Sequence, residues 1–375
     1  MDQAADETKP LPDTASDDAA EELGPVNVAL LVDEDYVNRF GSLFGHMVIG
    51  LVDEVVNVTV VCPDPELLSR LPTGPTRIVP FRPSAWPWRY RAQLDTLVEQ
   101  LDKYKVNVIH ACSGTQGNLA YDLAQRMELP YLVTVTGLLQ RECYWRLDRQ
   151  RCAALIAISE PIRRMLAEAY GSVADRIRLV RPGCFCRVRP PRPSEGHSRT
   201  IVSAGFFDRQ SGYDLLLRAL AKMAENNVEY VAFLFGTGPQ EYTLHRWARR
   251  AGLSSRVTFL PPIARWQGIL DDTDVYVQPG RFHRLHSGPY EALARGCPVV
   301  ATPETGFDLV VEGETGRLFP LGDEQALTDI LTEWLTKPDS LVDISQRTSQ
   351  FAKEHLSLRQ EVMKLIELYR SALAR

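Results

Sequence analysis

The feature that most restricts the fold of this chain is an alternation of short apolar runs with helical segments. In the first half, the apolar runs occupy residues 26–33, 56–63, 106–112, 131–137, 153–158 and 177–183. A loop around Gly41 is expected after the first run, and a basic and aromatic loop at 77–91 is expected after the second. These runs are rich in Val, Ile and Leu, which is typical of strands that are buried on both faces. Because a helical segment separates most runs from the next, the pattern predicts a parallel sheet covered by helices on both sides.

The same alternation starts again after a break in composition. Residues 187–199, RVRPPRPSEGHSR, carry Pro, Ser, Gly and charge in place of the apolar periodicity, so they are the best linker candidate. Beyond them, apolar runs at 200–207, 230–239, 256–262 and 271–279 again alternate with helical segments, the first of which is expected at 213–225. Two such halves predict two doubly wound α/β domains that face a central cleft, with ligands at the carboxyl ends of the strands.

The domain boundaries are expected where the composition changes. Residues 1–24 are rich in Asp, Glu, Ala and Pro and predict a disordered acidic tail. The N-terminal domain is then expected at 25–186, the linker at 187–199, the C-terminal domain at 200–355, and a C-terminal helix at 356–375 that packs back toward the N-terminal domain. A length of 375 residues agrees with about two domains.

Composition excludes several classes of protein. A net charge of −6 argues against non-specific binding to nucleic acid. No apolar run is long enough for a transmembrane helix, and the first residues lack the basic-then-apolar signal of a secretory peptide. The seven cysteines are scattered without zinc-like pairs, which favours reduced thiols in the cytoplasm. Two DxD matches, at 33–35 and 272–274, are interpreted as loop and helix-end residues, so no metal is expected.

Residues 279–301, PGRFHRLHSGPYEALARGCPVVA, are the candidate working centre of the chain. A polar loop that carries Arg281, His283 and Arg284 leads into Ser287-Gly288-Pro289, which is a plausible helix start with Pro in its first turn. The amides at a helix N-terminus, together with basic side chains, form a natural site for an anion. This stretch therefore predicts an anion site at the edge of the second sheet.

Ordered motifs give the chain a resemblance to a known family. The motifs are IAISE with RRML and YG at 156–171, IRLVRPG at 177–183, FGTGP at 235–239, YEALARGCPVVAT at 290–302 and VVEGETGRLF at 310–319. In this order they resemble the retaining glycosyltransferases of family 4, and the resemblance extends from about residue 26 to residue 375. It implies the GT-B fold, which consists of two Rossmann-like domains facing a cleft.

The resemblance implies that the C-terminal half binds a nucleotide-sugar donor and that the N-terminal half holds the acceptor. No further cofactor would be needed. Glu291 matches the family carboxylate that binds the donor ribose, a role for which a carboxylate is suited because it accepts hydrogen bonds from paired hydroxyls. The other expected donor-binding residues are Gly205, Arg209, Gly236, Gly238, Pro262, Ile263, Arg281, Arg284, Ser287 and Gly288. His283 and Thr136 stand at the positions nearest the reacting centre.

Four positions depart from the family pattern. His283 replaces a Glu near the donor sugar, and Thr136 replaces a His in the N-terminal domain. Phe206 and Ser211 replace an Arg and a Lys that neutralise the diphosphate. Fixed charges facing a leaving group commonly contribute several kcal/mol to the stability of a transition state, so losing both cations would be severe unless other residues replace them.

Two hypotheses remain open for the activity. Arg209, Arg281 and Arg284 could supply the missing positive charge, in which case the chain is a retaining glycosyltransferase of the hexosyltransferase type. Alternatively, the same arginines are solvated loop residues, and the chain is a catalytically degenerate relative that binds a nucleotide, sugar or partner without turnover. A sugar epimerase is a third class, for which no residue gives specific support.

The acceptor is expected to be a carbohydrate, a lipid or a small molecule. Residues 81–91 combine basic and aromatic side chains, among them Trp86, Trp88 and Tyr90. Such a run could stack an acceptor sugar, meet a membrane surface as a peripheral contact, or simply pack as a loop. Ordinary loop packing is the favoured interpretation, and this segment is where acceptor specificity would be sought.

Overall fold

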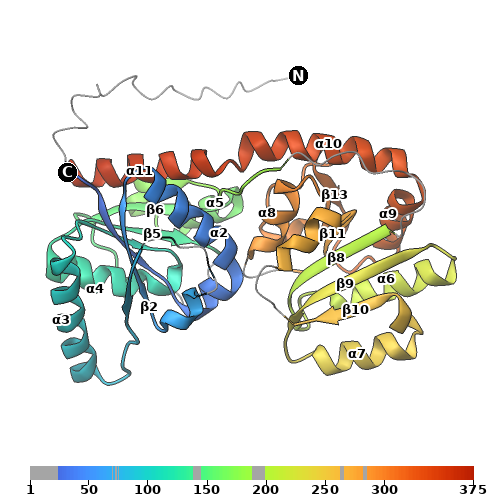
Figure 1. Cartoon of the computed structure of the whole chain (residues 1–375), viewed down its shortest axis with the longest axis horizontal. Coiled ribbons are helices and arrows are strands. Elements are labelled where there is room, and N and C mark those ends of the chain that lie inside the picture. The colour runs from blue at the N-terminus through green and yellow to red at the C-terminus, as the bar shows by residue number, and fades with distance from the viewer. Residues whose placement is uncertain are drawn as a thin grey trace.

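The computed structural model describes residues 24–69, 71, 74, 76–137, 145–187, 199–261, 266–281 and 285–375. The chain forms two lobes that lie side by side, and the C-terminal helices run along one edge of both (Figure 1). The expected tail at 1–24 lies almost entirely outside the described residues, and so does most of the expected linker at 187–199.

The N-terminal lobe contains a seven-stranded parallel sheet in the order β3-β2-β1-β4-β5-β6-β7. Its strands are β1 (Asn27–Leu31), β2 (Asn57–Cys62), β3 (Arg77–Pro80), β4 (Val108–Ala111), β5 (Tyr131–Val135), β6 (Cys152–Ala157) and β7 (Ile177–Leu179). Its helices are α2 (Glu34–Asp53), α3 (Pro87–Lys103), α4 (Gly117–Met127) and α5 (Glu160–Ala169), with 3₁₀ turns η1 (Pro65–Leu68), η2 (Gly114–Gln116) and η3 (Gly171–Arg176).

The C-terminal lobe contains a six-stranded parallel sheet in the order β10-β9-β8-β11-β12-β13. Its strands are β8 (Arg199–Phe206), β9 (Tyr230–Thr237), β10 (Val257–Leu260), β11 (Val275–Gln278), β12 (Val299–Ala301) and β13 (Gly316–Leu318). Its helices are α6 (Tyr213–Glu225), α7 (Glu241–Arg250), α8 (Ser287–Ala294), α9 (Glu324–Thr336) and α10 (Pro338–His355), with 3₁₀ turns η4 (Leu253–Ser255), η5 (Trp266–Asp272) and η6 (Pro303–Thr305). Two parallel sheets with alternating helices confirm the predicted fold class.

Two elements differ from the expectation. Residues 77–80 were expected in a loop but form β3, an edge strand in which only Val79 is buried, so no apolar run marks it. A loop was expected around Gly41, but α2 runs through it without a break. This glycine faces Leu71, because a Cβ on it would lie 3.2 Å from the Leu71 Cδ2 atom.

The two lobes are joined where the strand-like segment after β7 meets the end of α10. The Cys184 N–H donates to the Leu356 carbonyl at 2.8 Å, and Cys184 forms an isolated parallel bridge with Ser357. Gly183 permits this approach, since a Cβ there would lie 2.5 Å from the Leu358 Cα. From this junction α11 (Leu358–Leu373) crosses to the N-terminal lobe, where it packs against α2 (Figure 1).

Candidate functional site

The carboxyl ends of β8 and β11 lie next to each other and bring two predicted arginines together. The Arg281 N–H donates to the Gln210 carbonyl at 2.9 Å, which joins the loop after β11 to the loop after β8. Gly280 is required at this contact, because a Cβ on it would lie 2.3 Å from the Gln210 carbonyl oxygen. Arg209 and Arg281 therefore project from adjoining loops, and both are exposed.

Three predicted glycines, Gly205, Gly236 and Gly238, lie where the carboxyl ends of β8 and β9 approach each other. A Cβ on Gly236 would lie 2.1 Å from the Gly205 carbonyl oxygen, and a Cβ on Gly238 would lie 2.5 Å from the Phe207 carbonyl oxygen. A side chain at either position would force these backbones apart. The glycines thus shape the edge of the sheet that carries Arg209.

The two residues that replace family cations take different places at this edge. Phe206 is 56% exposed at the end of β8. Ser211 is buried, and its hydroxyl donates to Asp208 Oδ1 at 2.7 Å, while its N–H donates to the same oxygen at 2.9 Å. Ser211 therefore holds the turn together and offers no charge to a ligand.

The start of α8 is buried, and the side chain of its N-cap residue, His286, accepts a hydrogen bond from the backbone of the first turn. The His286 Nδ1 accepts the Gly288 N–H at 3.1 Å. Burial, aided by the charge of Arg39, lowers the pKa of His286 to about 3, so this imidazole is neutral at physiological pH. Ser287 and Gly288 thus lie at a helix start, as predicted, but the Gly288 N–H already donates a hydrogen bond within the chain.

The carboxylate of Glu291 lies inside the lobe, where it forms an ion pair with Arg295. Arg295 Nε lies 3.1 Å from Asp271 Oδ1, and Asp271 Oδ2 lies 3.1 Å from Arg187 Nη1. The other carboxylate oxygen, Glu291 Oε1, is buried and has no hydrogen-bond partner among the described residues. A buried acceptor without a partner is costly, so this oxygen is a place where a ligand hydroxyl would be stabilised.

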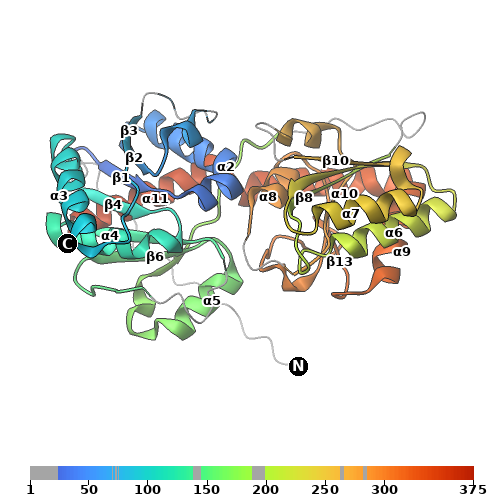
Figure 2. The same ribbon diagram turned by 90° about the horizontal axis from the view of Figure 1, so that it is seen from below.

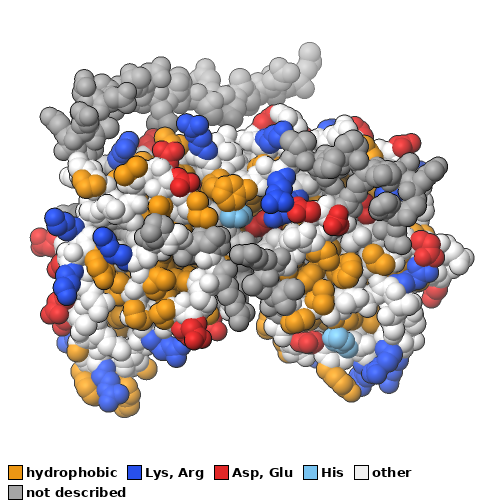
Figure 3. All heavy atoms as spheres, viewed as in Figure 1, with side chains coloured by type: hydrophobic (Ala, Val, Ile, Leu, Met, Phe, Trp, Pro, Cys, Tyr) orange, Lys and Arg blue, Asp and Glu red, His pale blue; other side chains and the backbone are white. Residues whose placement is uncertain are grey.

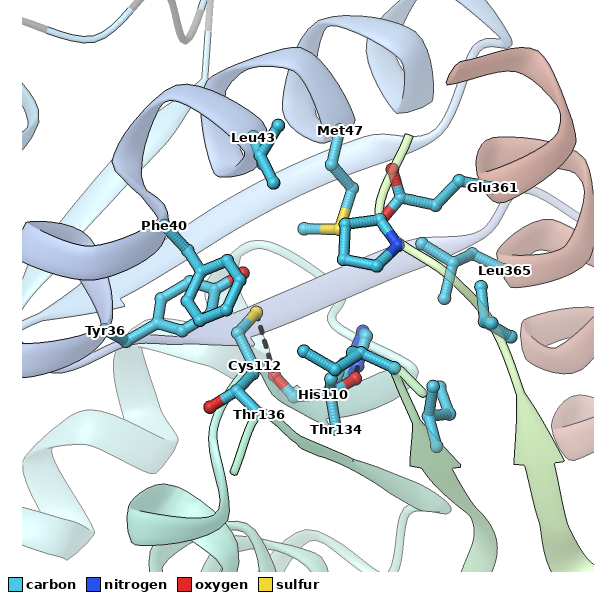
Figure 4. A pocket seen from close by; sticks show the side chains of 14 residues that line it. Tyr36, Phe40, Leu43, Met47, His110, Cys112, Thr134, Thr136, Glu361 and Leu365 are labelled. Carbon is cyan, nitrogen blue, oxygen red and sulfur yellow. Dashed lines mark hydrogen bonds between the residues drawn. The ribbon is translucent and has the colours of Figure 1, made fainter. Parts of the chain in front are cut away.

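Thr136 is buried at the end of β5, where it lines a cavity in the N-terminal lobe (Figure 4). The cavity of about 30 Å³ lies between α2, α11 and the strand ends, and it has room for one or two water molecules but not for a sugar. His110 lies in its wall, hydrogen-bonded to Thr134 Oγ1 and to the Tyr369 hydroxyl at 2.7 Å each. Burial lowers the pKa of His110 to about 3, so it is a neutral structural group.

Contacts across the cleft hold the lobes in this arrangement, and none of them was expected from the sequence. Asp308 Oδ2 accepts a hydrogen bond from the Glu160 N–H at 2.8 Å and pairs with Arg181 Nη2 at 2.8 Å. On α2, Arg39 Nη1 donates to the Leu285 carbonyl at 2.6 Å. These partners are far apart in the sequence, so no local pattern signals them.

Some of the predicted site lies outside the described residues, namely Pro262, Ile263, His283 and Arg284. Within the described part of the chain, no group of three His, Cys, Asp or Glu side chains could hold a metal ion. Asp33, from one DxD match, caps α2 by accepting the Tyr36 N–H at 2.7 Å. Burial raises the pKa of Asp33, but hydrogen bonds from Thr115, Tyr36, Gln116 and Ser113 outweigh burial and lower this pKa overall. No described helix is both long and apolar enough to cross a membrane.

Curated relatives of this chain are glycosyltransferases. The lipopolysaccharide core biosynthesis mannosyltransferase LpcC of Rhizobium leguminosarum bv. viciae is 27% identical over 265 residues, covering 66% of this chain and 73% of the relative. The D-inositol 3-phosphate glycosyltransferase of Rhodococcus erythropolis is 29% identical over 237 residues, covering 58% of this chain and 53% of the relative. The matched region thus spans about three quarters of the first relative and about half of the second.

Solved structures share the arrangement of both lobes. A glycosyltransferase from Rickettsia africae superposes with a TM-score of 0.76 at 14% identity, covering 93% of this chain and 99% of that chain. Anabaena HepE, solved in complex with UDP-glucose, gives a TM-score of 0.76 at 18% identity, with coverage of 91% and 98%. Identities this low show the fold alone.

Two family models together span nearly all of both lobes. The model described as Glycosyltransferase Family 4 matches residues 44–184, and the one described as Glycosyl transferases group 1 matches residues 187–354. The junction between the matches falls at the crossing between the lobes, so each model corresponds to one lobe. The chain therefore belongs to the group 1 glycosyltransferases of the family 4 type and has their GT-B fold.

Proposed function

We propose that this chain transfers a glycosyl group from a nucleotide-sugar donor to an acceptor, with retention of the anomeric configuration. The observation that carries the proposal is the junction of the loops after β8 and β11, where Arg209 and Arg281 project from adjoining backbones. Membership of the family supports it, as do relatives named as glycosyltransferases and a structural neighbour solved with UDP-glucose.

The two arginines would neutralise the diphosphate in place of the cations that the chain lacks at Phe206 and Ser211. A guanidinium presents several N–H donors in a planar fork, which matches the oxygens of a phosphate. Because the Arg281 N–H is tied to the Gln210 carbonyl, the two side chains start from a fixed separation. Preorganised charge of this kind stabilises a leaving diphosphate without reorganisation during the reaction.

The free oxygen of Glu291 supports its proposed role at the donor ribose. Arg295 engages one carboxylate oxygen, while Oε1 has no hydrogen-bond partner among the described residues. A carboxylate accepts about four hydrogen bonds, so the ion pair leaves capacity for a ribose hydroxyl. Arg295 would then hold the carboxylate in a fixed orientation.

The reaction is proposed to take place in the cytoplasm. Six of the cysteines, Cys62, Cys112, Cys152, Cys184, Cys186 and Cys297, are free thiols within the described residues. Unpaired cysteines are typical of proteins in a reducing compartment. The acceptor is proposed to be a carbohydrate, lipid or small molecule that enters from the N-terminal lobe.

The test is a transfer assay over a panel of nucleotide sugars with wild type and the double variant Arg209→Ala/Arg281→Ala. Hydrogen bonds to charged groups contribute about 1.5–3 kcal/mol each, so losing both arginines should lower kcat/KM by roughly 100-fold or more. Arg347→Ala, which removes an exposed arginine from the surface of α10, is the matched control and should leave transfer unchanged. Analysis of the product anomer tests retention, and an inverted product would overturn that part.

The second hypothesis, binding without turnover, is favoured by one observation. Ser211 is locked to Asp208 inside its turn, so the position of a family cation is structurally occupied. This hypothesis predicts that wild type binds a nucleoside diphosphate but turns over no donor. If the triple variant Phe206→Arg/Ser211→Lys/His283→Glu then gained transfer activity, the enzyme proposal for the natural chain would be wrong.

A further inference from the structure

Each lobe ends in an exposed patch of aromatic and basic side chains. The first patch, called tip 1, lies at the start of α3 and consists of Arg82, Trp86, Trp88, Arg89 and Arg91. Both indoles are strongly exposed, Trp86 by 63% and Trp88 by 64%. Apolar side chains of this size are rarely left in water without a function.

The second patch, called tip 2, lies on α7 and consists of Tyr242, Arg246, Arg249 and Arg250. Tyr242 is 72% exposed, and the Arg246 guanidinium lies 5.6 Å from its ring centroid. Tip 1 repeats this pairing, with the Arg89 guanidinium 5.0 Å from the Trp88 ring. Both tips therefore combine an exposed ring with an arginine held beside it.

The two tips lie on the same side of the molecule. Because α3 follows β3 and α7 follows β9, each helix starts at the carboxyl edge of its parallel sheet. In Figure 1, α3 runs down the left side of its lobe to the lower left, and α7 lies along the lower edge of the other lobe; both are visible from below in Figure 2. Figure 3 shows apolar and basic side chains at the lower ends of the lobes, on the side where the notch between them opens.

The charge of the tips contrasts with that of the whole chain. The net charge is −6, so a cationic surface is not the general character of this protein. Arginines elsewhere form ion pairs, as Arg146 does with Asp122, whereas the arginines of the tips pair with no acidic residue in the described ranges. Their charge is therefore available to an external anion.

We propose that tips 1 and 2 together bind the anionic surface of a lipid bilayer, with the cleft opening toward the membrane. Indole and phenol rings are enriched at the level of lipid headgroups, because one part of the ring is apolar and the other is polar. Arginines beside them attract anionic headgroups, and their stems cover apolar surface while the charge stays in water. Contacts on both sides of the cleft orient the opening toward the membrane.

A bilayer fits these tips better than the other partners that the sequence allows. A sugar that stacks on one ring would use one lobe, whereas the tips carry exposed rings on both. Nucleic acid would be drawn to a continuous basic stripe, whereas these patches lie apart on different lobes. A planar anionic surface touches both tips at once, and two anchored points reinforce each other as linked binding sites do.

The test is co-sedimentation of the full chain with vesicles of phosphatidylglycerol and phosphatidylcholine, compared with vesicles of phosphatidylcholine alone. The wild type should bind the anionic vesicles, and 1 M salt should weaken binding because it shortens the range of charge attraction to about 3 Å. Trp fluorescence should shift to shorter wavelength on binding, and Trp86→Ala/Trp88→Ala should lose most of that shift.

Variants separate the two tips from the rest of the surface. Each arginine near an anionic surface contributes about fivefold in affinity, so Arg82→Glu/Arg89→Glu/Arg91→Glu should weaken binding by roughly 100-fold or more. The matched change in tip 2, Arg246→Glu/Arg249→Glu/Arg250→Glu, should weaken it to a similar extent. The control is Met363→Ala/Lys364→Glu/Arg370→Glu on α11, on the opposite edge in Figure 1, which should bind as the wild type does.

Three outcomes would overturn the proposal. The first is that the wild type fails to bind anionic vesicles at low salt, whether or not it binds an oligosaccharide or DNA. The second is that the tip variants bind as well as the wild type while circular dichroism shows them folded. The third is that the α11 control loses binding to the same extent. Vesicle binding is measured without donor or acceptor, so these results are independent of the proposed transfer activity.

Discussion

Glu361, which lies in the wall of the cavity between α2 and α11, should contribute a loss of stability as the pH rises (Figure 4). Its Oε2 atom accepts the N–H of Gly183 at 2.8 Å, close to the crossing between the lobes. Burial raises the pKa of this carboxyl from 4.5 to about 8, although the hydrogen bond from Gly183 acts in the opposite direction. The folded chain therefore holds the proton more tightly than the unfolded chain does.

The sign of the effect follows from this difference. A group whose pKa is raised on folding contributes its full stabilisation below its unfolded pKa, and that contribution is lost as the pH rises through its folded pKa. For Glu361 the loss occurs between about pH 4.5 and about pH 8. Each pKa unit corresponds to about 1.4 kcal/mol, and allowing for the partial exposure of the side chain, we expect a loss of about 3 kcal/mol over this window.

The substitution that isolates this effect is Glu361→Gln, which keeps an oxygen to accept the Gly183 N–H but cannot ionise. Urea unfolding at pH 5, 7 and 9 should show the variant gaining about 3 kcal/mol relative to wild type between the acidic and alkaline ends. Glu367→Gln, on an exposed position of the same helix, is the control and should follow the wild type. Parallel curves for wild type and Glu361→Gln would refute the reasoning.

Two further predictions concern the contacts that shape the cleft. Asp308→Ala removes the acceptor of the Glu160 N–H and the partner of Arg181. Urea unfolding should therefore show that the free energy of unfolding falls by about 2–3 kcal/mol, and by less for Asp308→Asn. An unchanged free energy would mean that this contact does not hold the lobes. Gly236→Ala would place a Cβ 2.1 Å from the Gly205 carbonyl oxygen. The variant should therefore lose about 1–3 kcal/mol of stability, measured by thermal unfolding, and bind nucleotide more weakly. The control Gly171→Ala, which has open space around it, should keep the stability of the wild type.

The overall fold could be predicted because both sheets are parallel and covered on both faces. Strands in such sheets read as continuous apolar runs, and the helix expected at 213–225 is found as α6 (Tyr213–Glu225). The strand β3 was missed because it is not buried on both faces. It lies at the edge of the sheet with Arg77 and Ile78 exposed, so it carries none of the burial that marks the other strands.

The site residues expected from the sequence stay a prediction, and only part of their pairing in the structure has a local signal in the sequence. The pairing of Glu291 with Arg295 follows from a spacing of four residues on one helix, which brings opposite charges together, and it could have been read from the sequence. The extension to Asp271 and Arg187 could not, because it depends on how η5 and the crossing segment pack beside α8.

That extension links the Glu291 carboxylate to the crossing between the lobes. Arg187 lies at the crossing between the lobes, and its N–H donates to the carbonyl of Ala294 on α8 at 2.9 Å. The chain of charges therefore connects Glu291 to the crossing between the lobes. Because Arg295 lies four residues from Glu291, this pair stays together wherever Arg187 lies, whereas the contacts of Asp271 with Arg295 and Arg187 depend on how η5 and the crossing segment pack beside α8.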